Sequence, residues 1–254
     1  MNLFTMKKIA SIMLILLLGG TAAAGASDST DTSGTVAAKK AIVKATARLH
    51  SMGLFSYGGR LVSHNHVMDV HVVYNRKTWG FQFFKAVDLH DRRTPINFAM
   101  AAFNRPFHLG DRLTLTPHVG ILLEQTSSLA DYGSDVAGFL TASYRLRPNF
   151  TVEYTGIFAN LVIAPGHRDW INRLRLLYTD GHLDVTLFGW HNNQVFDAQT
   201  YGAVGISVFM SRLPLSGPFS LQTGLTGLYM ASASEERLRE GASGLFLTLG
   251  VTVN

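Results

Sequence analysis

The chain has 254 residues and no cysteine, and its 22 lysine and arginine residues outnumber its 17 aspartate and glutamate residues. The absence of cysteine excludes a disulfide framework, a thiolate metal site and a lipid anchor on an N-terminal cysteine. The formal net charge of +5 is too small to indicate a nucleic-acid-binding protein.

The N-terminus has the features of a secretory signal. Lys7 and Lys8 precede a short apolar run, Ile9 to Leu18, and Ala24-Gly25-Ala26 matches an A-x-A cleavage site. The run is too short for a transmembrane helix. We therefore predict a cleaved signal peptide over residues 1–26. Removing its two lysines from the 22 basic residues leaves 20 against 17 acidic residues, and export is a second reason to expect no nucleic-acid partner.

Residues 27–51 are expected to form a periplasmic lead-in. The first part is polar and of low complexity, which favours disorder. Over residues 36–50, Lys40, Lys44 and Arg48 recur every four residues, which indicates a short basic amphipathic helix or an irregular lead-in. Such a segment could plug a pore or touch anionic lipid, or it could be a solvated linker.

The last ten residues show the pattern that recurs through the rest of the chain. Aliphatic side chains occupy every second position: Leu245, Leu247, Leu249, Val251 and Val253. In a strand these side chains share one face, and that face needs a large apolar partner. The partner is a second sheet in a soluble sandwich and lipid in a membrane, where about ten residues suffice for a tilted strand.

The pattern predicts twelve strands, and no stretch after the signal approaches the length of an apolar transmembrane helix. The predicted strands span residues 52–63, 66–75, 78–88, 95–105, 112–124, 135–146, 149–161, 169–179, 182–192, 200–212, 218–232 and 242–254.

Connection lengths support this assignment, because membrane barrels alternate short periplasmic turns with longer extracellular loops. The even-numbered connections are short, and Asp180-Gly181 is a strong hairpin signal. The odd-numbered ones are generally longer and more polar. Only the first connection, near His64-Asn65, breaks the rule. The alternation predicts that both ends of the barrel chain are periplasmic.

In these respects residues 52–254 resemble bacterial outer-membrane β-barrel proteins as a class. The resemblance implies one all-β domain in the cell outer membrane, an antiparallel up-and-down transmembrane barrel of about twelve strands, with ten or fourteen as alternatives. Outer-membrane lipid would surround it. A closed barrel has no free edge, which favours a monomer. The chain departs from the class at Asn254, where an aromatic residue is common.

The alternation also assigns side chains to the two faces of the barrel wall. The clearest lipid-facing sets are Ile96/Phe98/Met100, Leu113/Leu115/Val119/Ile121, Leu174/Leu176/Tyr178, Leu183/Val185/Leu187 and Val204/Ile206/Val208/Met210. Aromatic residues near strand ends predict two interfacial girdles. These are Trp79, Tyr144, Phe150, Tyr178 and Phe219 on the periplasmic side, and Trp170, Tyr201 and Tyr229 on the outer side.

Charged and histidine side chains on the other face are candidates for the lumen. They are Asp69, His71, Arg105, His118, Glu124, Arg145, Glu153, Arg173, Arg175 and Asp184. Arg173 and Arg175 lie two residues apart on one strand, and with Arg145 they could form a basic track for small anions. Alternatively, the arginines pair with the acidic candidates and neutralise a filled lumen.

No catalytic, cofactor or metal site is predicted. The ten histidines are scattered, and His64 and His66 lie in a predicted loop without an HExxH motif. Asp131 and Asp135 lack the dense spacing of a calcium loop, so we expect a solvated turn there. No GxSxG motif marks a nucleophile.

Three functions remain from the sequence. The leading hypothesis is a small porin-like channel for small polar or anionic solutes. The first alternative is a structural or interaction barrel that acts through its extracellular loops, with a lumen packed by Phe139, Phe188, Trp190 and Phe209. The second is a membrane-embedded lipid hydrolase, which requires a serine and a histidine adjacent on one face of the barrel.

Overall fold

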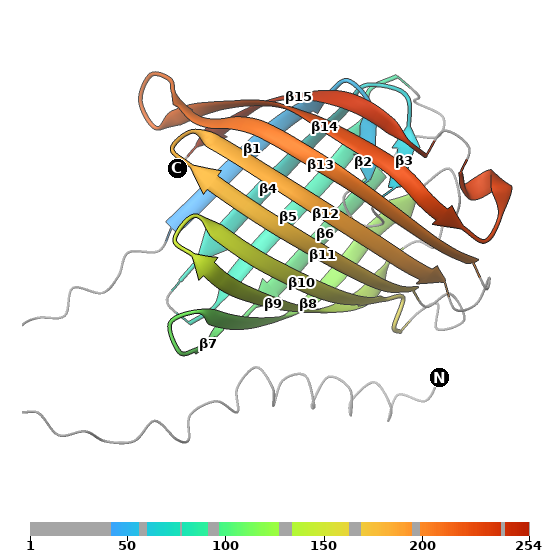
Figure 1. Ribbon diagram of the computed structural model, residues 1–254, viewed down its shortest axis with the longest axis horizontal. Helices are drawn as coiled ribbons and strands as arrows, with labels where there is room; N and C mark the ends of the chain where they lie inside the picture. The colour runs from blue at the N-terminus through green and yellow to red at the C-terminus, as the bar shows by residue number, and fades with distance from the viewer. Residues whose placement is uncertain are drawn as a thin grey trace, which may run out of the picture. The chain divides into compact units, whose positions relative to one another are not determined.

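Twelve antiparallel strands form a closed β-barrel in a computed structural model, so the fold predicted from the sequence is confirmed (Figure 1). The structure describes residues 42–55, 60–76, 78–90, 97–126, 134–162, 169–194, 199–239 and 242–253. The predicted signal peptide lies outside these residues. Within them, no helix is long and apolar enough to cross a membrane.

Each strand of the barrel pairs with its neighbours along the chain, and β15 pairs with β1 to close the ring. The strands are β1 (Ile42–His50), β4 (Val67–Asn75), β5 (Gly80–Asp88), β6 (Asn97–Asn104), β8 (Leu113–Thr126), β9 (Asp135–Arg147), β10 (Phe150–Ala159), β11 (Asp169–Asp180), β12 (Leu183–Gln194), β13 (Gln199–Pro214), β14 (Phe219–Ala233) and β15 (Gly244–Val253).

The first barrel strand is β1, which corrects the boundary that the sequence predicted. Residues 42–50 were expected to belong to the lead-in, as a short helix or irregular segment, but they pair with both β15 and β4. Val43 and Leu49 are exposed on the outer side of this strand, and Thr46 and His50 are buried on the inner side. A spacing of four residues between basic side chains fits two strand periods as well as one helical turn, so it could not distinguish the two structures.

Residues 52–63 do not form a barrel strand. They contain β2 (Gly53–Phe55) and β3 (Arg60–Ser63), a small hairpin within the connection from β1 to β4. This connection is therefore long, and the one exception to the alternation of loop lengths disappears. We call the end of the barrel that carries the long connections the loop end, and the opposite end the turn end.

The turn end has short connections, as predicted. Two-residue turns join β9 to β10 and β11 to β12, and Gly181 provides the positive φ of 53° that the second of these turns needs. The connection from β6 to β8 contains β7 (Phe107–Leu109), an extra strand that pairs with β8 outside the ring. At the loop end, a 3-10 turn, η2 (Glu236–Leu238), lies between β14 and β15.

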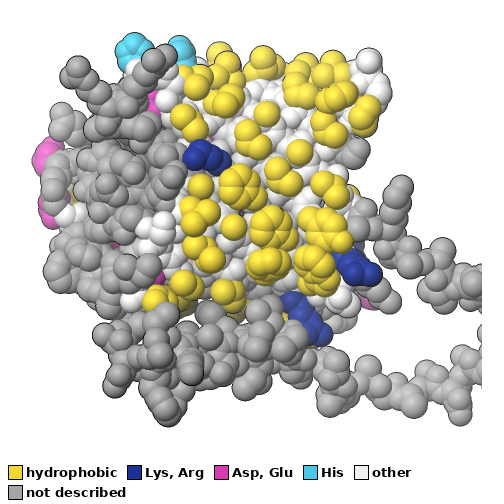
Figure 2. All heavy atoms as spheres, turned by 180° about the vertical axis from the view of Figure 1, so that it is seen from behind, with side chains coloured by type: hydrophobic (Ala, Val, Ile, Leu, Met, Phe, Trp, Pro, Cys, Tyr) yellow, Lys and Arg dark blue, Asp and Glu magenta, His cyan; other side chains and the backbone are white. Residues whose placement is uncertain are grey.

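The outer wall of the barrel is apolar, and Figure 2 shows hydrophobic side chains gathered over it with few charged groups among them. On β15, Leu245 and Leu247 are each 61% exposed, whereas the intervening Phe246 is 2% exposed. The predicted lipid faces of β8, β11, β12 and β13 likewise include exposed side chains: Ile121, Leu174, Leu187, Val204, Ile206, Val208 and Met210. Exposed apolar side chains over a whole wall are the band that a membrane covers.

Two outward assignments are wrong. Met100 borders the interior cavity, because the outward position of β6 is taken by Phe103, which is 55% exposed and lies opposite Phe81. Tyr201 is buried inside the barrel, where its hydroxyl accepts a hydrogen bond from Asn192 Nδ2 (2.9 Å). In both cases the register with the neighbouring strands determines whether the side chain points outward or inward. The local sequence does not reveal that register.

The aromatic groups that do lie on the outer wall occur near both ends. Towards the loop end, Phe158 and Trp170 are exposed and stack with ring centroids 5.7 Å apart. Towards the turn end, Trp79 contacts Tyr74 and Phe103. These positions fit the interfacial girdles of membrane barrels.

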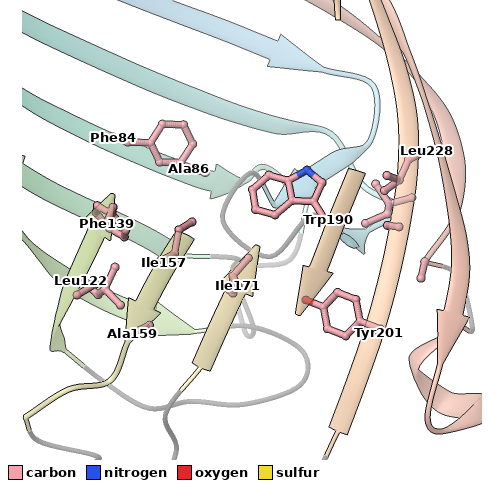
Figure 3. Packing of buried hydrophobic residues seen from close by; sticks show 14 of the residues in the cluster. Phe84, Ala86, Leu122, Phe139, Ile157, Ala159, Ile171, Trp190, Tyr201 and Leu228 are labelled. Atoms are coloured by element: carbon pink, nitrogen blue, oxygen red, sulfur yellow. The ribbon is translucent and has the colours of Figure 1, made fainter. Parts of the chain in front are cut away.

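The loop half of the barrel interior is filled by an apolar layer. Figure 3 shows its side chains pointing inward from strands on several sides of the barrel. The β2–β3 hairpin contributes Leu61 and η2 contributes Leu238, both almost completely buried. Buried members from the strands include Val67, Leu122, Ala137, Ala159, Ile171, Tyr201, Leu228 and Met230. The loop half is therefore packed, and open space lies elsewhere.

The membrane face of β15 can be tested with one charge at two depths. We expect Leu249→Arg, near the middle of the strand, to lower the free energy of unfolding by about 2–4 kcal/mol, because lipid does not solvate a guanidinium. Val253→Arg, at the strand end, should cost only about 0–1 kcal/mol. Urea unfolding of the protein folded into lipid vesicles measures both values. Equal costs at the two positions would contradict a lipid-facing wall.

Candidate functional site

A cavity of about 590 Å³ lies inside the barrel. Its described lining comes from β1, β4, β5, β6 and β8 to β12, and none of it from β13, β14 or β15. One part of the lining is apolar and includes Phe84, Phe139, Ile157 and Trp190, which belong to the apolar cluster of the interior. The rest of the lining carries arginines, hydroxyls and amides. The cavity thus has an apolar part and a cationic, polar part.

A cross-strand ladder forms the cationic wall. Glu153 on β10 lies directly opposite Arg175 on β11, and Arg175 Nε donates a hydrogen bond to Glu153 Oε1 (2.9 Å). Arg173 Nη2 also reaches Glu153 Oε1 (3.3 Å), and it donates to Thr155 Oγ1 (3.2 Å). One carboxylate therefore holds two guanidinium groups. Because the three side chains are mostly buried, this pairing offsets part of their desolvation cost.

Arg173 also joins the cationic wall to the apolar part of the cavity. It lies opposite Trp190 in the β11–β12 register, and its guanidinium carbon is 5.3 Å from the Trp190 ring centroid. This distance is that of a cation–π contact. The indole therefore limits where the guanidinium can move.

A second polar network crosses the seam where the barrel closes. Arg48 Nε and His50 Nε2 lie 2.8 Å and 2.7 Å from the two carboxylate oxygens of Asp69. His50 Nδ1 is 2.8 Å from Thr248 Oγ1 on β15. One more hydroxyl pair, Thr46 with Thr252, lies across the same seam at 3.0 Å. Side chains of β15, β1 and β4 are thereby bonded into one unit.

The charges around the cavity do not cancel. Arg48, Arg173 and Arg175 line the cavity, whereas Glu153 is the one described carboxylate in its wall. Asp69, which pairs with Arg48, is the second partner. Three arginines against two carboxylates leave one positive charge in excess. Close walls of low dielectric strengthen the attraction of such a charge for anions.

The sequence candidates for the lumen fall into two groups. His71, His118, Glu153, Arg173 and Arg175 line the cavity, and Asp69 is buried beside it in the seam network.

The other candidates lie away from the cavity. Asp184 pairs with Arg212 near the turn end. Arg145 is exposed and donates to the backbone carbonyl of Asp111, so it is separate from the two cavity arginines. The Arg105 guanidinium lies over the Phe107 ring. The side chain of Glu124 lies outside the described part of the structure.

Sequence analysis missed Arg48 and His50, because their strand was assigned to the lead-in. The signal that could have found them is the run of outward aliphatic and alanine residues at every second position from Val43 to Leu49. The sequence prediction also omitted uncharged lining residues such as Gln82 and Thr116, because no charge pattern marks them.

The aromatic side chains expected to pack the lumen do so only in part. Phe139 and Trp190 border the cavity. Phe209 covers Gly224, where an added side-chain carbon would lie 2.5 Å from the ring, and Phe188 covers Gly205 in the same way. Glycine at these two positions lets the rings lie against the wall. The aromatic groups therefore narrow the lumen and leave the cavity open.

The described histidines do not form the arrangement that a hydrolase requires. His66 Nδ1 and His182 Nδ1 lie near the backbone carbonyl oxygens of Ser51 and Ser211, not near their hydroxyls. Two hydroxyls do contact a described histidine, and both belong to threonine. Thr248 Oγ1 is 2.8 Å from His50 Nδ1, but Thr248 is only 2% exposed, so a substrate could not reach it. Thr114 Oγ1 is 3.0 Å from His108 Nδ1 on the exposed pair of strands β7 and β8. Among the described residues, no group of three or more histidine and acidic side chains could hold a metal ion.

Asp135 corrects another expectation. It was predicted to lie in a solvated turn, but it is 1% exposed and its Oδ1 accepts hydrogen bonds from the backbone N–H groups of Val136 (2.6 Å) and Val162 (2.9 Å). It fixes the start of β9 against the segment after β10. Its neighbour in the sequence hypothesis, Asp131, lies outside the described residues.

Comparison with solved structures finds bacterial outer-membrane barrels of the same fold. The KdgM porin matches with a TM-score of 0.56 over 83% of this chain and 98% of its own, at 6% sequence identity. The NanC porin matches with a TM-score of 0.53 over 84% and 100%, at 10% identity. KdgM in a second structure, with disordered oligogalacturonate, matches at a TM-score of 0.54 and 6% identity. No protein-family model and no curated protein matches the sequence. The fold thus agrees with the predicted location in the cell outer membrane.

The role of Glu153 in the wall can be tested by its removal. We expect Glu153→Ala to lower the free energy of unfolding by about 2–3 kcal/mol, because two partly buried guanidinium groups lose their shared partner. Glu153→Gln is the matched control: it keeps an acceptor of similar size and should cost about half as much. Urea unfolding followed by tryptophan fluorescence measures both. Wild-type stability of Glu153→Ala would show that the arginines need no counter-charge.

Proposed function

We propose that the protein is a narrow porin-like channel of the outer membrane that conducts small polar solutes and prefers anions. The observation that carries this proposal is the cavity with its excess of arginine inside a closed barrel. Guanidinium groups in a pore wall attract anions and repel cations of similar size. Ion pairing to Glu153 and Asp69 holds the arginines in place without neutralising all of them.

The comparisons support the same reading. The KdgM and NanC porins resemble this barrel over most of its length, and KdgM was also solved with oligogalacturonate, a chain of sugar acids. Sequence identity is low, so the support is for a barrel of this architecture acting as a channel. The solute of this protein has to be argued from its own wall.

A second candidate function rests on the apolar layer of the loop half. Side chains such as Leu61, Leu122 and Ile171 are almost completely buried there, and they fill the interior between the cavity and the long connections. A barrel whose interior stays packed would act through its loops as a structural or interaction protein. For a channel, the same layer is a hydrophobic constriction that limits the flow of ions.

Conductance in planar bilayers separates the two candidates. We expect the folded protein to show a small single-channel conductance. Under a salt gradient, the sign of the reversal potential should be the one that indicates a preference for anions. In Arg173→Gln/Arg175→Gln that potential should move towards zero or change sign, because two positive charges leave the wall. The matched control is Arg212→Gln, which removes an arginine paired at the turn end and should leave the potential near that of the wild type.

The contrary results are equally clear. A folded, heat-modifiable barrel that never conducts would favour the packed interaction barrel. Conduction with no anion preference, unchanged in the double variant, would remove the arginines from selectivity.

A further inference from the structure

We propose that the cavity binds small organic carboxylates with an apolar body, such as aryl or branched alkyl acids. This inference rests on the proposed function and deepens it, because it names the solute class of the same cavity. It follows from three properties of the wall: its division into an apolar and a cationic part, its excess charge, and polar atoms that lack a partner.

The division of the wall sets the shape of the ligand. Phe84, Phe139 and Ile157 offer hydrocarbon and no hydrogen-bonding group, and the labelled side chains of Figure 3 point into the interior. The Arg173 guanidinium lies at the border, 5.3 Å from the Trp190 ring centroid. A ligand that fills the cavity therefore presents an apolar body to one part and a negative group to the other. A polyhydroxylated solute would bury hydroxyls against hydrocarbon without partners.

Two nitrogen atoms of the wall are buried and have no hydrogen-bond partner among the described residues: Arg173 Nε and His118 Nδ1. Arg173 already uses Nη2 on Glu153 and Thr155, so Nε is the N–H that is left for a further acceptor. The His118 ring lies edge-on to Phe139, at the border of the apolar part. Buried polar atoms are nearly always bonded in folded proteins, so unpaired ones in a cavity wall indicate a polar ligand. Arg173 Nε–H can only donate, so that ligand must accept a hydrogen bond, and His118 Nδ1 donates as well in one tautomer.

Charge and size agree with this ligand. One monoanion matches the single positive charge that Glu153 and Asp69 leave unpaired. The volume of about 590 Å³ falls within the range of sites for small molecules. A carboxylate is also the planar acceptor that suits a guanidinium, because both of its oxygens can be bound at once.

The test uses Trp190 as an internal reporter. Trp79 and Trp170 lie on the outer wall, with 37% and 45% of their surface exposed, and Trp190 lines the cavity. In the Trp79→Phe/Trp170→Phe protein, folded in detergent, fluorescence therefore reports the cavity. The probes are 3-phenylpropionate, its neutral alcohol 3-phenylpropanol, and galacturonate as a carboxylate without an apolar body.

We expect 3-phenylpropionate to change the fluorescence saturably, with a Kd at least about tenfold below those of the two comparison compounds. Arg173→Gln should weaken its binding by about tenfold or more, because the anion loses its partner. Ile157→Ser should also weaken it, and Arg212→Gln should not. The same titration of Trp79→Phe/Trp170→Phe/Trp190→Phe, which has no tryptophan, gives the background signal. Titration of protein-free detergent micelles measures ligand uptake by the detergent.

Failure of this inference is distinguishable from failure of the proposed channel. Equal or tighter binding of galacturonate would overturn the solute class, and an anion-selective conductance would still support the channel. Saturable, Arg173-dependent binding of 3-phenylpropionate by a barrel that does not conduct would support the inference and remove the channel. Binding of the neutral alcohol as tightly as the acid would overturn the role of the arginines.

Discussion

The structure depends on one constraint: a strand in lipid must have both of its edges hydrogen-bonded, because hydrocarbon cannot solvate backbone N–H and C=O groups. The ring meets this constraint when β15 pairs with β1. Every other feature follows from closure. Side chains alternate between a lipid face and an interior face, and the interior becomes a space whose contents depend on residues two apart along each strand.

Inside that space the protein separates apolar from charged side chains along the barrel. The loop half is packed with aliphatic and aromatic groups, and the cavity wall carries arginines. Glu153 makes the second arrangement stable, since it binds both Arg173 and Arg175, and Asp69 does the same for Arg48 in the seam. The carboxylates that hold the arginines are too few to neutralise them. The proposed preference for anions arises from this excess of positive charge.

The sequence was sufficient for the fold because a period of two over ten or more residues has few alternatives. The strand β13, whose apolar positions from Val204 to Met210 alternate with small or aromatic residues, left no ambiguity. Prediction failed where one pattern fitted two structures. The basic residues of β1 were four apart, and Met100 lay in a segment apolar on both faces. The residues of the cavity could be predicted only in part. The alternation of side chains predicts that Glu153 and Arg175 face the interior. Which residues share a hydrogen-bond partner depends on register and on contacts between distant strands, which the alternation does not reveal.

The two polar networks of the interior differ in how far along the chain they reach. Glu153 and Arg175 are 22 residues apart, on strands joined by one hairpin. The seam instead unites Thr46 with Thr252, 206 residues away, and Arg48 packs across Gly250 of the same last strand. Arg48 and Asp69 are likewise only 21 residues apart, on consecutive strands of the barrel, but the bonds that join their network to β15, through His50 and Thr248, exist only after the first and last strands have met. Assembly and solute recognition therefore share a final step, since a barrel that has not closed has an incomplete cavity.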